Sequence, residues 1–185
     1  MFTFGRDHEK KCVSLYVRNK NQLPLAWAAI DSVHDVLDGK ITADQMCQIL
    51  REAFAEGGAG VWESAGYWFR KAAAVCPDEV KGSWLTLSRS PSANLRWRVA
   101  CFLHEMPEEV LKVVAPGLVA DKSRKVQEMA EARVKQRERK GEIQLYVQAD
   151  RGTASSPDPT LPPRRLNMAL GFIGDVDGSE LDGDA

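Results

Sequence analysis

The chain has 185 residues, with 25 Lys plus Arg against 26 Asp plus Glu, and 44% of its side chains are apolar. This composition fits one soluble domain with an additional tail, and it excludes both a membrane protein and a wholly disordered one. The longest uninterrupted apolar stretches, residues 23–30 and 113–120, are far too short to span a bilayer. The first eleven residues carry charges of both signs where a signal peptide needs apolar residues, so we expect a cytoplasmic protein.

Charge is unevenly distributed along the chain. Residues 1–88 carry 10 basic and 11 acidic groups, residues 89–140 carry 12 and 7, and residues 141–185 carry 3 and 8. One interpretation is a basic binding face followed by an acidic tail, and the other is a solvated helix followed by a solubilising extension.

The first half of the chain predicts four helices, because apolar residues recur at spacings of three and four and the breaks carry capping residues. Their expected ranges are 6–19, 24–38, 43–55 and 61–75. In the first helix Cys12, Leu15 and Tyr16 share one apolar side. Thr42 is placed to cap the third helix, and a glycine-rich loop then ends it.

Four more helices are predicted between residues 77 and 140. The fifth opens at Pro77, the sixth spans 92–104, the seventh opens at Pro107 and the eighth spans 123–140. A proline in the first turn with carboxylates beside it is typical of a helix start. Pro116 should kink or split the seventh helix.

The chain changes character after residue 140. Residues 141–150 are expected to form a short helix or a strand, and residues 151–185 a flexible linker and acidic tail. Within that tail, residues 165–173 form a short apolar stretch that could dock on the helices or bind a partner.

An internal repeat organises the helices. The sequence Cys-Pro-Asp-Glu-Val at 76–80 recurs as Met-Pro-Glu-Glu-Val at 106–110, and each copy leads through one helix and a short break into a second. The best copies are residues 76–105 and 106–140. The earlier helix pairs repeat the order of helix, break and helix but show no sequence similarity to these copies. The repeat predicts an all-α domain over residues 1–140, built from about four antiparallel helical hairpins stacked side by side.

These repeats resemble the HEAT-like helical repeats, whose pattern is a proline, then an aspartate, a valine five residues on, an arginine directly after it, and small residues in the second helix. The later copy matches this pattern at Pro107, Asp121, Val126 and Ala130 and departs from it at Gln127. The earlier copy matches at Pro77 and Arg98 and departs at Ser92 and Trp97. The resemblance implies a right-handed stack, an α-solenoid, and a role in binding another macromolecule.

The sequence contains the beginnings of several catalytic or metal-binding motifs, but none of these motifs is complete. His104-Glu105 starts like a zinc-protease motif, but residue 108 is glutamate rather than histidine. The glycines of 57–60 lack the Lys-Ser or Lys-Thr pair of a phosphate loop, and the four cysteines form no CxxC pair. The sequence therefore predicts no catalytic residues, no metal site and no cofactor.

Tryptophans gather in the middle of the chain, at Trp62, Trp68, Trp84 and Trp97. They either fill the space between helices or, together with arginines, line the concave face of a curved stack, where such residues make binding hot spots. Trp97 between two arginines is the best candidate for the second role. The candidate partner-binding residues are Arg96, Trp97, Arg98, Arg124, Lys125 and Gln127.

The leading functional hypothesis is a non-enzymatic protein-binding module, and the resemblance permits an adaptor, an assembly factor or a toxin-neutralising immunity-type protein. The alternative is a nucleic-acid-binding protein related to the HEAT-like DNA glycosylases that excise alkylated bases. The net charge of +4 over residues 1–140 is low for a duplex binder. A third hypothesis is that the acidic tail covers the basic block within the molecule.

Overall fold

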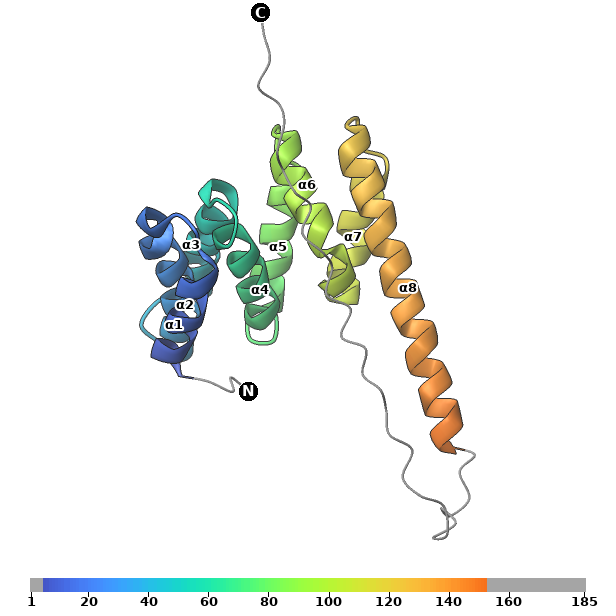
Figure 1. Ribbon diagram of the computed structural model, residues 1–185, viewed down its shortest axis with the longest axis horizontal. Helices are drawn as coiled ribbons and strands as arrows, with labels where there is room; N and C mark the ends of the chain where they lie inside the picture. The colour runs from blue at the N-terminus through green and yellow to red at the C-terminus, as the bar shows by residue number, and fades with distance from the viewer. Residues whose placement is uncertain (1–4, 153–185) are drawn as a thin grey trace, which may run out of the picture.

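The computed structural model describes residues 5–152 and shows eight α-helices in that range (Figure 1). The all-α prediction is confirmed for these residues, which contain no strand. The helices are α1 (Arg6–Tyr16), α2 (Leu23–Leu37), α3 (Ala43–Glu56), α4 (Val61–Ala72), α5 (Pro77–Ser88), α6 (Ala93–Phe102), α7 (Glu108–Val119) and α8 (Arg124–Gly152). Short 3-10 helices, η1 (Lys20–Gln22) and η2 (Leu103–Glu105), precede α2 and follow α6. Among the described helices, none combines the length and the apolar character that a bilayer crossing requires.

The helix starts follow signals carried by the local sequence. At α3 the Thr42 hydroxyl accepts a hydrogen bond from the backbone N–H of Gln45, and the Gln45 side chain accepts one from the N–H of Thr42. This reciprocal capping box satisfies two N–H groups that a helix start otherwise leaves unpaired. The Ser92 hydroxyl accepts from the N–H of Leu95 at the start of α6, and Pro77 lies in the first turn of α5.

Helix α7 runs as one helix through Pro116, so the expected split is not found. Proline removes the hydrogen bond to the carbonyl of Lys112, but only three residues of the helix follow it. Ala115 and Leu118 on either side are buried, so packing against the core holds the last turn in place.

Helix α8 is longer than predicted. It continues from Arg124 to Gly152, so residues 141–150 belong to this helix and no boundary falls at residue 140. Its 29 residues correspond to a length of about 44 Å, and Figure 1 shows its end projecting beyond the other helices. The apolar stretch 165–173 and the acidic tail lie outside the described residues.

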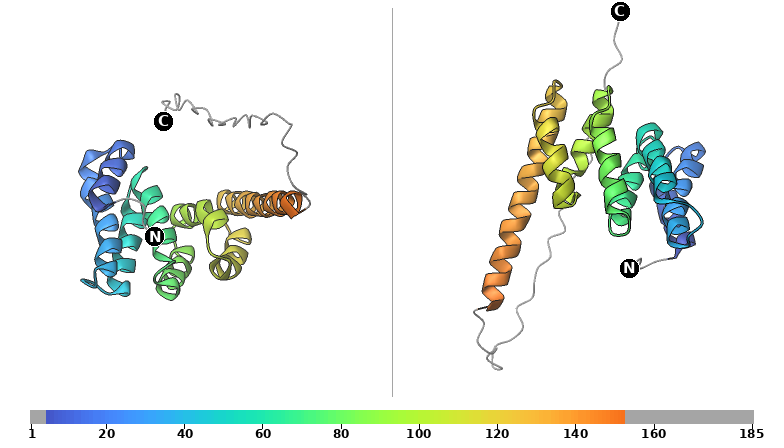
Figure 2. Two further views of the ribbon diagram at one scale, coloured as in Figure 1. Left: turned by 90° about the horizontal axis from the view of Figure 1, so that it is seen from below. Right: turned by 180° about the vertical axis from the view of Figure 1, so that it is seen from behind.

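The helices pack as consecutive pairs, with α3 against α4, α5 against α6 and α7 against α8. Figures 1 and 2 show these pairs side by side. Helix α5 contacts both α3 and α7, which together form one row, while α6 contacts α8 in the other row. Helix α2 packs on both α3 and α4, and α1 packs on α2. One cluster of buried apolar side chains extends from Val13 in α1 to Ala130 in α8.

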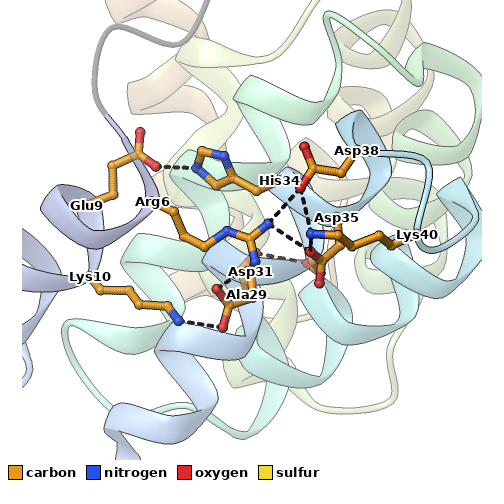
Figure 3. Close-up of polar contacts among 10 residues, drawn as sticks. Arg6, Glu9, Lys10, Ala29, Asp31, His34, Asp35, Asp38 and Lys40 are labelled. Carbon is orange, nitrogen blue, oxygen red and sulfur yellow. Dashed lines mark hydrogen bonds and ion pairs between the residues drawn. The ribbon is translucent and has the colours of Figure 1, made fainter.

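Ion pairs attach α1 to α2 (Figure 3). Asp31, Asp35 and Asp38 are spaced so that they share one face of α2. Arg6 of α1 contacts all three at 3.5, 2.7 and 3.3 Å, and Lys10 lies 2.7 Å from Asp31. The hydrogen bond from Arg6 lowers the pKa of Asp35, as expected for a carboxylate held by a cation.

This attachment determines which side of α1 is buried, and that side differs from the expected one. Val13 is buried, whereas Leu15 and Tyr16 are 76% and 68% exposed. Besides the ion pairs, the Nε2 of His34 in α2 lies 2.6 Å from the Oε2 of Glu9 in α1 (Figure 3). These polar contacts orient the helix so that the predicted apolar side faces away from the core.

Candidate partner-binding face

Aromatic rings fill the seam where α3 and α4 face α5 and α6. The Trp84 ring lies 4.9 Å from that of Phe69 and is only 2% exposed. The Trp62 ring lies 5.9 Å from Phe102 and 6.1 Å from Trp97. At these separations aromatic pairs attract one another. The space-filling interpretation therefore holds for Trp84, while Trp62 and Trp97 lie at the partly exposed edge of the seam.

Gly66 allows a ring to lie directly on the backbone of α4. A Cβ at this position would stand 2.2 Å from the Cζ of Phe102 in α6. Helix α4 thus meets α6 through large side chains rather than by close backbone approach. This spacing leaves room for the indoles of Trp62 and Trp97 beside Phe102.

Each of the two partly exposed tryptophans has a cation over its ring. The guanidinium carbon of Arg98 lies 5.5 Å from the ring centre of Trp62, and the Nζ of Lys125 lies 4.5 Å from that of Trp97. A cation within about 6 Å of an aromatic face is attracted by the electrons of the ring. We name Trp62, Trp97, Arg98 and Lys125 the tryptophan–cation face, to which α4, α6 and α8 all contribute.

Arg98 also caps the C-terminal end of helix α3. Its Nη1 donates hydrogen bonds to the backbone oxygens of Phe54 and Ala55 at 2.8 and 3.0 Å. The last carbonyls of a helix lack partners within the helix, so the guanidinium satisfies two of them. Burial lowers the pKa of Arg98. The two hydrogen bonds to α3 fix the position of the Arg98 guanidinium.

Arg96 lies inside the fold and not on this face. It is 6% exposed and forms two hydrogen bonds with the carboxylate of Asp121, at 2.6 and 2.9 Å. It also donates to the carbonyls of Ser90 and Pro91. Arg96 thereby ties α6 to the loop before α8, and we do not include it in the candidate face.

The three candidate residues of α8 point in different directions. Val126 is buried, and because successive helical residues are about 100° apart, Lys125 and Gln127 flank it on opposite sides. Arg124 points outward and pairs with Glu128 at 2.6 Å, with its side chain 88% exposed. Of the six residues predicted from the sequence, the structure therefore gathers Trp97, Arg98 and Lys125.

Cys101 shows that α4, α6 and α8 border one surface. Glu63 of α4 and both Lys125 and Arg133 of α8 lie close enough to this α6 thiol to influence it electrostatically. Burial raises the pKa of Cys101 to about 11. The thiol is therefore protonated at neutral pH and is a poor nucleophile.

Two features were not marked by the sequence pattern. Trp62 is not among the six candidate residues, although Arg98 lies over its ring. A pocket of about 500 Å³ lies between α1 and α4, whose residues are far apart in the sequence. The glycine-rich loop 57–60 was a local sign of a tight approach there, but nothing in the sequence pattern pairs it with α1. Among the side chains of residues 5–141, no cluster of His, Cys, Asp or Glu could hold a metal ion.

No protein-family model, curated protein or solved structure matches this chain.

Proposed function

We propose that this chain is a non-enzymatic protein-binding module, built as a HEAT-like stack of helical hairpins, that holds another protein on the tryptophan–cation face. The observation that carries the proposal is the pair of partly exposed tryptophans with Arg98 and Lys125 over their rings. Tryptophan and arginine are the residues most enriched among binding hot spots. Because Arg98 is anchored on α3, the face needs little ordering when it binds.

The packing of the helices supports the same proposal. Pairs of helices lie side by side in two rows, and the second helices of the last three pairs supply the face. An extended surface of this kind suits a macromolecule better than a small substrate. An adaptor, an assembly factor and an immunity-type inhibitor all fit this surface.

The test reverses the charge of Lys125, which lies over the indole of Trp97. Lys125 is exposed, so Lys125→Glu should leave the fold intact while placing a carboxylate against the electron-rich ring of Trp97. Proteins recovered on the immobilised full-length chain are quantified by mass spectrometry, and the partner is then titrated against the purified variants. We expect the variant to weaken binding of the specific partner by about tenfold or more.

Lys112→Glu is the matched control. Lys112 lies on α7 in the other row, and its side chain is 70% exposed. It carries the same charge reversal away from the tryptophan–cation face, so partner recovery should equal that of the wild type. Equal recovery by both variants would show that the face does not bind the partner.

Nucleic-acid binding is the second candidate, and the contacts of the basic residues favour it less. Arg96 is paired with Asp121, Arg98 with carbonyls of α3, and Arg124 with Glu128. These side chains would have to leave existing contacts to neutralise phosphates. Retention of the wild type on a DNA column at low salt, with a steep loss as salt rises, would favour this candidate instead.

A further inference from the structure

The pocket between α1 and α4 is a second site, separate from the tryptophan–cation face. It has a volume of about 500 Å³ and opens to solvent on one side. Cavities of this size accommodate small organic ligands. Its walls come from α1, from the loop before α4 and from α4 itself.

Gly60 makes this pocket possible. It has a φ of 85°, a backbone conformation that residues other than glycine rarely adopt. A Cβ at this position would stand 2.9 Å from the backbone oxygen of Tyr16. The loop also donates a hydrogen bond from the N–H of Gly58 to the side chain of Gln22 at 2.8 Å. The start of α4 is thus pressed against the end of α1, and this contact closes one end of the pocket.

The walls are apolar and rich in aromatic rings. Tyr16 comes from α1, and Tyr67 and Trp68 come from α4. The rings of Tyr67 and Trp68 meet edge to face, with centroids 5.5 Å apart. Tyr67 is 38% exposed and therefore accessible to a ligand. Arg70 and Lys71 lie 4.9 and 5.4 Å from the centre of the Tyr67 ring, so a ligand cation would share this ring with them.

The carboxylates of two glutamates lie in the lining of the pocket. Glu9 and Glu63 line it, and the described part of the chain contributes no lysine or arginine to the lining. Both carboxylates are held in place, since Glu9 lies 2.6 Å from His34 and Glu63 accepts a hydrogen bond from the N–H of Gly60 at 2.8 Å. His8 also lines the pocket.

We propose that the α1–α4 pocket binds a small organic cation, an ammonium ion that carries apolar substituents. The aromatic walls attract the positive charge through their faces and cover the apolar substituents, while Glu9 and Glu63 balance the charge. A neutral apolar ligand would fill the same space but would not be attracted by the two carboxylates. An anion would be repelled by them.

The test compares a cation with its neutral isostere on the full-length chain. Choline and 3,3-dimethylbutan-1-ol have nearly the same shape, but only choline is charged. We expect choline to shift the amide NMR signals of residues 9–16 and 60–68 in a saturable way. The neutral alcohol should bind about tenfold more weakly or worse, because it forgoes the electrostatic attraction.

Three variants test whether the carboxylates and the Tyr67 ring contribute to choline binding. The double variant Glu9→Gln plus Glu63→Gln keeps hydrogen-bonding side chains but removes both charges, and it should weaken choline binding about tenfold. Tyr67→Leu keeps apolar volume but removes a ring, and it should weaken choline binding without affecting the alcohol. The matched control Glu109→Gln, at an exposed position on α7, should leave the affinity unchanged. Thermal unfolding of each variant checks that the fold is retained.

Several outcomes would overturn the proposal. Equal affinity for choline and the alcohol would make the pocket a purely apolar site. Shifts confined to other helices, or no saturable shift, would show that the cation does not bind there. Binding of a lysine-bearing peptide in the absence of any choline binding would assign the pocket to a protein segment. Lys125→Glu should not alter choline binding. A negative choline result would therefore overturn the pocket proposal without affecting the proposed role of the tryptophan–cation face.

Discussion

Arg96 and Arg98 are two residues apart on α6, yet the fold gives them different roles. Arg96 forms a buried pair with Asp121, and Arg98 reaches the carbonyls of Phe54 and Ala55 at the end of α3. The sequence shows two arginines beside a tryptophan, and that much predicted a site at this position. The partner of Arg96 lies 25 residues away and the carbonyls that hold Arg98 lie 44 and 43 residues away, so no local pattern shows which arginine is buried.

The buried pair predicts a strong and acid-sensitive effect of Asp121→Ala. The variant leaves the buried Arg96 guanidinium unpaired, which should lower the free energy of unfolding by about 3 kcal/mol at neutral pH. Hydrogen bonding by Arg96 lowers the pKa of Asp121, so the wild-type stabilisation is present above the ordinary carboxyl pKa of about 4 and is lost as pH falls through the folded pKa. Urea unfolding measured at several pH values checks both parts.

The exposed pair of α8 is the control for this prediction. Arg124→Ala removes a salt bridge of similar length whose side chains are 88% and 62% exposed, and it should cost less than about 1 kcal/mol. A similar loss in both variants, or a difference between wild type and Asp121→Ala that persists unchanged at low pH, would contradict the assigned role of the buried pair.

At the scale of the element, local sequence signals predicted where helices begin better than they predicted which side of a helix is buried. The capping box at Thr42 and the first-turn proline of α5 fix helix starts within a few residues, so those starts were predictable. The buried side of α1 was not, because ion pairs to Asp35 and its neighbours on α2 oriented the helix. Residues 141–150 are helical, which was one of the two alternatives, but they continue α8 and do not form a separate short helix.

Gly60→Ala tests how the loop before α4 joins two elements. The added Cβ meets the backbone of Tyr16 and the positive φ disfavours alanine, so we expect a loss of about 1–3 kcal/mol in unfolding free energy. Gly82→Ala is the matched control, because nothing lies within 4 Å of its added Cβ in α5. That variant should be stabilised by up to about 1 kcal/mol. Thermal unfolding measures both, and equal behaviour would show that the loop is not constrained.

At the scale of the whole molecule, one hydrophobic cluster connects α1 to α8, but the end of the array is covered less completely. Helices α5 and α6 have neighbours on both sides, whereas α1 packs mainly on α2. A large part of its attachment is the half-exposed network around Arg6. The all-α class could be predicted from the helical spacing of apolar residues, whereas the aromatic seam depended on contacts between helices that are far apart in the sequence.

Salt should therefore loosen α1 before the rest of the molecule. Raising the ionic strength from about 0.1 M to 1 M shortens the screening length from about 10 Å to about 3 Å. Amide hydrogen exchange of α1 should accelerate while that of α5 stays unchanged. Arg6→Ala at low salt should reproduce the effect. Exchange in α1 that responds to neither change would show that apolar contacts alone hold this helix.

The aromatic seam between α4 and α6 has a mechanical consequence. Because Phe102 and its neighbouring indoles keep these helices apart, the distance between the two halves of the array depends on ring size. Rings resist compression, so they act as a spacer of defined thickness. Exchanging one ring for a smaller or larger side chain would therefore change the separation of α4 and α6 while leaving both helices intact. A single substitution at this seam would shift the two sets of helices relative to each other.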